Sequence, residues 1–230
     1  MRKIFFNIFK ALGCPLMWFV TLALVICIIR LPLAFADSRL AWACLGGFLV
    51  GLPLFYRYRC VPVYVFGHEL THWAVATLFM RKTSNIRLNR YSGSVDVSDP
   101  NIWIILGPYF LPFYMLVILG IFGVALFFKP TFPAWLEITI AAVIGLSYAF
   151  HIILTIIAIY NGQQDLKING VIFSLSIIIV CNVFYIYIGL MLATQQFLPG
   201  LKLLATQLGD QSRIFWQMCM NLAALCKASQ

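Results

Sequence analysis

Two histidines and a glutamate lie close together in an otherwise apolar stretch of the chain. They form the sequence His68-Glu69-Leu70-Thr71-His72, which has the pattern H-E-x-x-H. Residues four apart share one face of an α-helix, so both imidazoles can reach a single metal ion, with Glu69 beside them. In this pattern the two histidines bind Zn2+, and the glutamate accepts the proton of a zinc-bound water. The spacing therefore predicts a zinc-dependent hydrolytic site.

The rest of the composition makes this pattern more specific. The 230 residues include only 3 His and 7 Asp+Glu, yet two of the histidines and one of the acids fall within the motif. An ionisable side chain in lipid costs about 2.5–3.5 kcal/mol on insertion scales, so it needs a partner or a function. A bound metal ion would stabilise all three side chains. The alternative is a polar His–Glu cluster that holds membrane helices together.

A third metal ligand must come from elsewhere in the chain, because a catalytic zinc ion usually has three protein ligands and a water. Asp165 lies in the polar segment 161–169, and His151 lies in the middle of the apolar run that precedes it. An unbroken helix would separate these two residues by about 21 Å, so they cannot both reach one ion unless the chain unwinds. If the polar segment enters the membrane, Asp165 is the ligand. If it does not, His151 is the natural ligand at mid-depth.

The overall composition points to a chain whose solvent is mostly lipid. Hydrophobic residues make up 63% of the chain and charged residues only 10%, whereas soluble domains have about 25% charged residues. This excludes an ordinary soluble domain and a disordered protein. The net charge of +9 comes largely from basic residues between apolar runs, as at the ends of membrane helices. No basic stripe or binding motif accompanies it, so we expect a lipid bilayer and no nucleic acid as partner.

Apolar runs of about 20 residues predict transmembrane helices, and about six such runs follow one another. The predicted fold is therefore an all-α polytopic membrane protein. The predicted spans are Ala11–Ile29 extended to about Ala36, Leu40–Tyr56, Cys60–Met80, Pro100–Phe128, Ile138–Tyr160 and Gly170–Gln195. The first run is long for a signal peptide, so we expect an uncleaved helix; the alternative is cleavage after Ala34-Phe35-Ala36.

Two segments outside the spans have patterns of their own. Residues 86–97 alternate in polarity on both sides of Ser92-Gly93, which predicts a short β-hairpin between the third and fourth spans. Such a hairpin can offer an edge strand to an extended peptide, and the alternative is a solvated connection. After Pro199, apolar residues recur at near-helical spacing between charged ones. This predicts a C-terminal amphipathic helix in the membrane interface.

Taken together, these motifs resemble the site-2 protease family, the intramembrane zinc metalloproteases. Members carry H-E-x-x-H on a membrane helix, and a later Asp, typically followed by Gly and preceded by an Asn- and Pro-rich stretch, completes the zinc site. Phe66–Trp73 matches the first motif. Asn161–Asp165 matches the second in part, since Leu166 follows the Asp and no Pro precedes it. Gly107-Pro108 is similar to the Gly-Pro of the family's middle core helix.

The resemblance implies a zinc-dependent endopeptidase that cleaves transmembrane or membrane-proximal protein segments. It implies His68, His72 and Asp165 as zinc ligands and Glu69 as general base and acid. His151 and Asn161 are candidate oxyanion donors, and His151 remains the alternative third ligand. Two other functions stay open: a metal-binding membrane transporter, and a catalytically inactive scaffold that binds a membrane client.

The expected organisation follows from this resemblance, which covers roughly Cys60–Gln195. Residues 1–59 form two N-terminal transmembrane helices, and residues 60–196 form a metalloprotease-like membrane core of the compact type, without a PDZ domain. Residues 197–230 form the C-terminal amphipathic segment. We expect an integral membrane protein, with the bacterial cytoplasmic membrane as its default location.

Overall fold

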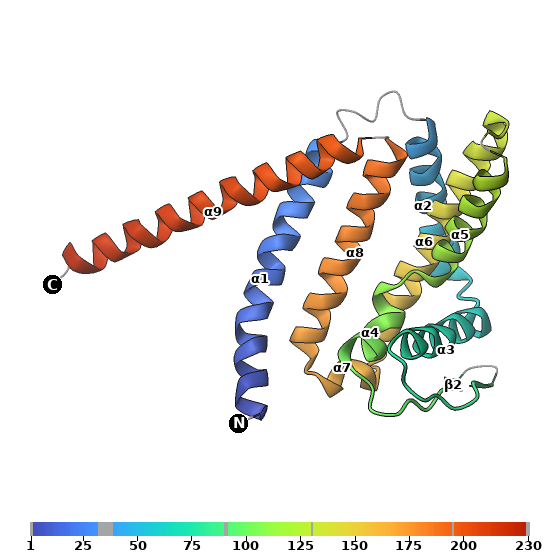
Figure 1. Cartoon of the computed structure of the whole chain (residues 1–230), viewed down its shortest axis with the longest axis horizontal. Helices are drawn as coiled ribbons and strands as arrows, with labels where there is room; N and C mark the ends of the chain where they lie inside the picture. Colours follow the sequence, from blue (N-terminus) through green and yellow to red (C-terminus); the bar gives the residue numbers. More distant parts are fainter. Residues whose placement is uncertain (1, 32–38, 90–91, 130, 195, 229–230) are drawn as a thin grey trace. The chain divides into compact units, whose positions relative to one another are not determined.

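The computed structural model of the chain is mostly helical (Figure 1). It describes residues 2–31, 39–89, 92–129, 131–194 and 196–228. The helices are α1 (Arg2–Arg30), α2 (Arg39–Arg57), α3 (Val61–Leu78), α4 (Ile102–Phe110), α5 (Phe113–Phe128), α6 (Ala134–Tyr160), α7 (Gln164–Ile168), α8 (Val171–Ala193) and α9 (Phe197–Ala228). The chain forms a terminal unit, Met1–Asp37 with Val183–Gln230, and a central unit, Ser38–Asn182.

Four described helices are long and apolar enough to cross a membrane. They are Lys10–Arg30 within α1, and the helices α2, α6 and α8. The pair α4 and α5 forms a fifth candidate span that is bent by 78° at its break. The predicted helical architecture with several membrane-spanning helices is thus confirmed within the described residues. The predicted number of six spans is not confirmed, since the described helices give four candidate spans, or five with the bent pair.

The predicted span that is missing from these candidates is Cys60–Met80, the segment with the H-E-x-x-H motif. It forms α3, but the polar motif lowers the mean hydropathy of this 18-residue helix. Figure 1 shows α3 running crosswise to α2, α5 and α6. Cys60 precedes α3 with a left-handed φ of 41°, and Pro62 in the first turn suits a helix start. The chain therefore changes direction before the motif helix instead of continuing as another parallel span.

The predicted span Pro100–Phe128 is broken by Pro112. Leu111, the residue before this proline, has an extended backbone with φ −91° and ψ 108°, because a following proline disfavours the helical conformation. The nine-residue α4 on one side of the break is buried from Ile104 to Phe110. Val75 and Ala76 of α3 pack with Ile104 of α4 in a buried cluster. The break therefore lets α4 stay against α3 while α5 continues in another direction.

Helices α2 and α6 approach each other closely at two glycines. A Cβ atom on Gly47 would lie 1.9 Å from the carbonyl oxygen of Ala142, and a Cβ atom on Gly145 would lie 1.9 Å from that of Cys44. Small residues let helix backbones come this close, which is a main source of packing between helices in lipid. This contact holds α6, which carries His151, against α2.

The predicted β-hairpin is present in the central unit. Strands β1 (Arg87–Leu88) and β2 (Gly93–Ser94) pair antiparallel, with Arg87 opposite Ser94 and Leu88 opposite Gly93. A bridge between Thr83 and Val97 continues the pairing towards the base of the hairpin. Residues 90–91, at its tip, lie outside the described part of the chain.

In the terminal unit, α9 begins against the end of α8. The Tyr187 hydroxyl donates a hydrogen bond to the Gly200 carbonyl at 2.8 Å, and Arg30 of α1 donates one to Gln207 Oε1 at 2.7 Å. Further along α9, large apolar side chains are exposed: Ile214, Phe215, Trp216, Met218 and Met220. The predicted C-terminal helix is thus present, and its place in the membrane interface stays a prediction. The candidate cleavage site at Ala34–Ala36 lies outside the described residues.

The close contact between α2 and α6 can be tested at neighbouring glycines. We expect Gly47→Ala to lower the free energy of unfolding in detergent by about 1–3 kcal/mol, because the added methyl group overpacks the helix contact. Gly46→Ala is the matched control, since a Cβ atom there meets nothing within 4 Å. It should leave stability unchanged or raise it by up to about 1 kcal/mol through helix propensity. Equal effects of the two substitutions would contradict the packing.

Candidate metal centre

Three predicted metal ligands come together in the central unit. Nε2 of His68 and Nε2 of His72 each lie 3.7 Å from Asp165 Oδ2. The ligand atoms of the three residues all lie within 4.8 Å of one another. Ligands at about 2.0–2.2 Å from a tetrahedral zinc ion are about 3.3–3.6 Å apart. The three side chains are therefore spaced to hold one ion, with one coordination position left over.

The two histidines reach this position because of their spacing on α3. They lie one turn apart on the same helix face, and their ring centroids are 4.8 Å apart. Both side chains are largely buried, with 9% of the His68 side chain and 13% of the His72 side chain exposed. The helix alone therefore fixes two of the three ligands.

Asp165 is supplied by α7, a five-residue helix between α6 and α8. Gly162 and Gly170 stand on either side of α7 with φ values of 72° and 90°, which glycine adopts without steric cost. Leu166 is buried, and its carbonyl accepts a hydrogen bond from Ser174 Oγ at 3.1 Å. Leu166 thus anchors α7 in the core and holds Asp165 towards α3.

Helix α4 supports the ligands through two hydrogen bonds. Nδ1 of His72 lies 2.7 Å from the Ile104 carbonyl oxygen. Because a carbonyl only accepts, Nδ1 is the donor and Nε2 is left for a metal ion. The Tyr109 hydroxyl donates to Asp165 Oδ2 at 2.8 Å. Sequence reasoning missed both contacts: Ile104 acts through its backbone, and the only available signal for Tyr109 was a phenol in an otherwise apolar helix.

The donor set fits a divalent cation such as Zn2+. Burial raises the pKa of Asp165, but the nearby imidazoles of His68 and His72 and the hydrogen bond from the Tyr109 hydroxyl outweigh burial and hold this pKa well below its usual range. The carboxyl group is thus ionised at neutral pH. Two imidazoles and one carboxylate are a common ligand set of catalytic zinc.

Glu69 lies beside the ligands and under the hairpin. It is buried, with 8% of the residue exposed, and its carboxylate accepts a hydrogen bond from the Val95 backbone N–H. A Cβ atom on Gly93 of β2 would lie 2.5 Å from Glu69 Cγ and 2.8 Å from Val65 Cγ1. Only glycine lets the strand lie this close to α3. The hairpin therefore covers Glu69 and orients its carboxylate.

His151 does not join the cluster of His68, His72 and Asp165. His151 is buried in α6, with 8% of the residue exposed, and its ring stacks on that of Tyr148. Asn161 is the exposed C-cap residue of α6. Of the two candidates for the third ligand, it is thus Asp165 that lies beside the histidine pair.

No protein-family model, curated protein or solved structure matches the chain. A functional assignment therefore depends on the geometry of the metal centre and on the sequence motif.

Metal content tests the ligand set. We expect purified protein in detergent to hold about one zinc ion per chain, because three ligands and an open position suffice for a catalytic site. Asp165→Asn should lose most of this zinc, since the charged ligand is removed. His151→Ala should retain it. Elemental analysis after dialysis against trace zinc measures both. Zinc loss in His151→Ala alone would contradict the assignment of Asp165.

The hydrogen bond from Tyr109 offers a second test. Loss of an outer partner of a metal ligand typically lowers metal affinity by about 10–100-fold, so we expect this effect from Tyr109→Phe in a competition titration with a chelator. Tyr114→Phe is the matched control, because its hydroxyl donates to the Val63 carbonyl and not to a ligand. An unchanged zinc affinity in Tyr109→Phe would show that this hydroxyl does not position Asp165.

Proposed function

We propose that the protein is a zinc-dependent endopeptidase of the site-2 protease type, which cleaves membrane-embedded or membrane-proximal protein segments. The observation that supports this proposal is the convergence of His68, His72 and Asp165 from two separate segments, with Glu69 next to them. A helical H-E-x-x-H pair with a third ligand and an adjacent carboxylate is the arrangement of zinc peptidases. The candidate membrane spans support a substrate in or near the bilayer.

Each residue at the centre has a definite role in this reaction. Bound zinc would polarise the scissile carbonyl group and make water a stronger acid. Glu69 accepts a proton from the attacking water and passes it to the leaving amine. The Val95 N–H holds the Glu69 carboxylate in place for both transfers, and the Tyr109 hydroxyl holds Asp165.

The hairpin suggests how a substrate is presented. It consists of two strands in the described structure, so each strand keeps one edge that the other does not pair. An extended peptide can add to such an edge through backbone hydrogen bonds. Because β2 contacts Glu69 through Gly93, a segment added to the hairpin would pass close to the metal centre.

Two other functions are less well supported. A metal transporter needs ligands distributed along a route through the membrane. In the described part of the chain, the one group of three or more potential metal ligands is the cluster of His68, His72 and Asp165. A catalytically inactive scaffold has no need of a carboxylate between the two histidines, whereas Glu69 is present and held by a hydrogen bond.

Replacement of Glu69 tests the proposal. We expect Glu69→Gln to retain zinc and fold, and to lower the rate of peptide cleavage by about 10²–10⁴-fold, because the proton acceptor is lost. Glu137→Gln, in the first turn of α6, is the matched control and should keep full activity. Cleavage of fluorescent model transmembrane peptides in proteoliposomes measures the rate, and elemental analysis measures the zinc.

Unchanged cleavage in Glu69→Gln would contradict a zinc-peptidase mechanism. Zinc flux across vesicles that contain the wild-type protein, with no cleavage of any peptide, would instead favour the transporter. If the wild-type protein and Glu69→Gln both bind the model peptides and neither cleaves them, the scaffold would be favoured.

A further inference from the structure

The direction of α2 and α6 puts the candidate metal centre at one end of the central unit. Gly47 of α2 lies against Ala142 of α6, and further along both helices Gly51 lies against Ala149. The two helices therefore run in the same direction and finish at the same end of the unit. Helices α3 and α7, which carry the candidate ligands, follow directly after α2 and α6, and Figure 1 shows both at this end. We call the end at which α2 and α6 finish the ligand end.

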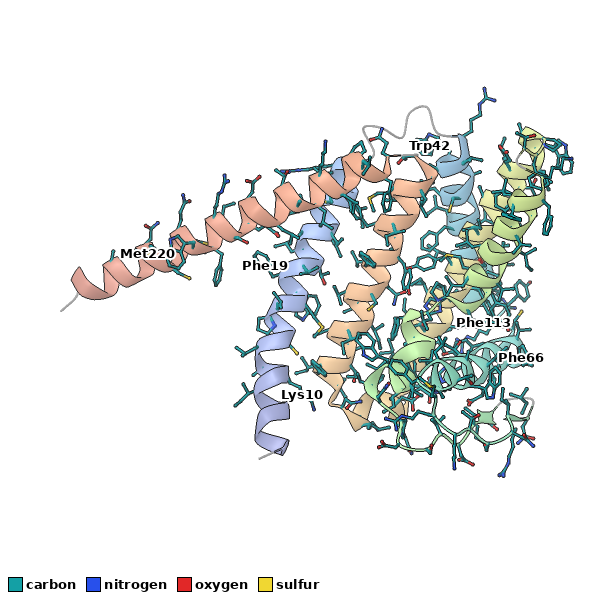
Figure 2. The ribbon with its side chains drawn as sticks, in the orientation of Figure 1. Lys10, Phe19, Trp42, Phe66, Phe113 and Met220 are labelled. Carbon is teal, nitrogen blue, oxygen red and sulfur yellow. The ribbon has the colours of Figure 1, made fainter. Side chains whose placement is uncertain are left out.

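Exposed aromatic side chains mark both ends of these two helices. Trp42 and Trp135 are exposed near the starts of α2 and α6. Tyr56 and Tyr160 are exposed at the ligand end. Figure 2 labels Trp42 and, on α3 at the ligand end, Phe66. Trp and Tyr are enriched at the two surfaces of a bilayer. Helix α6 measures about 38 Å from Trp135 to Tyr160, which exceeds the hydrocarbon thickness of about 30 Å. In a bilayer, Tyr160 would therefore lie at the membrane surface.

Basic side chains at the ligand end indicate the same level. Six exposed ones lie on the segments next to α3 and on α7: Arg57, Arg59, Arg81, Lys82, Arg87 and Lys167. A charged side chain in hydrocarbon is costly, whereas the headgroup region accommodates it. Two of these residues stand directly before α3 and two directly after it, so both ends of α3 would lie at the same membrane surface.

Helix α3 has the pattern of a helix that lies along such a surface. Val63, Phe66 and Trp73 are exposed, and their spacings of three and seven residues put them on one face of the helix. Glu69 and the two histidines lie on the other side, where the hairpin covers Glu69. The apolar face can rest on the acyl chains while the ligands stay at the level of the headgroups.

We propose that the metal centre acts at the membrane surface, and that its substrate is an extended segment directly beside the apolar part of a transmembrane protein. The inference rests on the proposed function and narrows its substrate from membrane-embedded to membrane-proximal segments. Asp165 follows Tyr160 by five residues, so it reaches the histidines without entry of the polar segment 161–169 into the hydrocarbon.

The state of the substrate backbone gives the physical reason. Inside the hydrocarbon a peptide must keep its own helical hydrogen bonds, because no water replaces them. At the surface, water and a strand edge can take over these hydrogen bonds, so a segment there can become extended at lower cost. The hairpin offers such an edge next to Glu69, and an extended segment can add to it.

Thiol labelling tests the position of α3 without any need for activity. Cys60 is exposed just before α3, and Asn85 is exposed in the segment after it. Right-side-out and inverted membrane vesicles that contain Asn85→Cys protein are treated with a membrane-impermeant maleimide, and mass spectrometry identifies the labelled residues. We expect both thiols to react in the same kind of vesicle, because α3 does not cross the membrane. Thr131→Cys, between α5 and α6 at the opposite end, is the control and should react in the other kind.

Labelling of Cys60 and Asn85→Cys from opposite sides would overturn the inference, since α3 would then cross the membrane. Protection of the Asn85→Cys thiol from both sides would also overturn it, because the hairpin segment would then be buried in the bilayer.

The place of the cut tests the substrate class. One peptide sequence is placed stepwise from the middle of a model transmembrane segment to ten or so residues outside it, and cleavage in zinc-loaded proteoliposomes is followed by mass spectrometry. We expect cleavage to be about tenfold or more faster within roughly five residues outside the apolar segment than at its middle, because the backbone unfolds more easily there. Glu69→Gln is the control and should cleave none of the series.

The two measurements distinguish failure of this inference from failure of the proposed function. Fastest cleavage at the middle of the transmembrane segment would overturn the inference and uphold the enzyme. Labelling of both thiols from one side, with no cleavage at any position, would uphold the location of the centre at the surface and refute the enzyme.

Discussion

The central unit is organised around two largely buried histidines and one partly buried carboxylate that meet at a single point. Asp165 Oδ2 lies 3.7 Å from both imidazole Nε2 atoms and accepts a hydrogen bond from Tyr109. Polar groups removed from water need partners, and these three side chains come from α3 and α7, which are far apart in sequence. Their mutual contacts offset part of the cost of burial, and a metal ion bound between them would offset more. The placement of α3, α4 and α7 follows from this requirement.

Backbone constraints make the convergence possible. Pro112 breaks the span so that α4 stays against α3, and Gly162 and Gly170 let the chain turn at both ends of the short α7. At Gly93 the absence of a side chain lets β2 lie directly over Glu69. Each of these residues acts through its backbone, and none contributes a ligand. The geometry of the candidate centre thus depends on one proline and three glycines that contribute no ligand.

Different elements border the candidate metal centre on its two sides. The hairpin covers the side of Glu69, where proton transfer would occur, and orients its carboxylate through the Val95 N–H. On another side, His68 and His151 both line a small, mostly apolar cavity. Hydrolysis of a peptide bond requires both a positioned proton acceptor and a bound amide segment. The position of Glu69 under the hairpin is consistent with the first of these requirements under the proposed function.

The sequence by itself determined the features that depend on neighbouring residues. Helical spacing places His68 and His72 on one face with Glu69 between them, alternation around Ser92-Gly93 gives the hairpin, and the low charge content gives the apolar helices. These patterns are local, so periodicity alone reveals them. The sequence could not give the number of candidate spans, because the polar motif in α3 and the break at Pro112 interrupt runs that look continuous.

Only the tertiary structure decided which distant residues meet. From the sequence, Asp165 and His151 were both candidates for the third ligand, because the direction of the chain after α6 depends on turns at Gly162 and Gly170. The folded chain brings Asp165 to the histidine pair and puts His151 in the wall of the neighbouring cavity. The partners Ile104 and Tyr109 were equally hidden, since α4 contacts the ligands through a carbonyl oxygen and a phenol that no spacing rule marks. Contacts over such sequence distances arise from the packing of whole helices, and a local pattern contains no information about them.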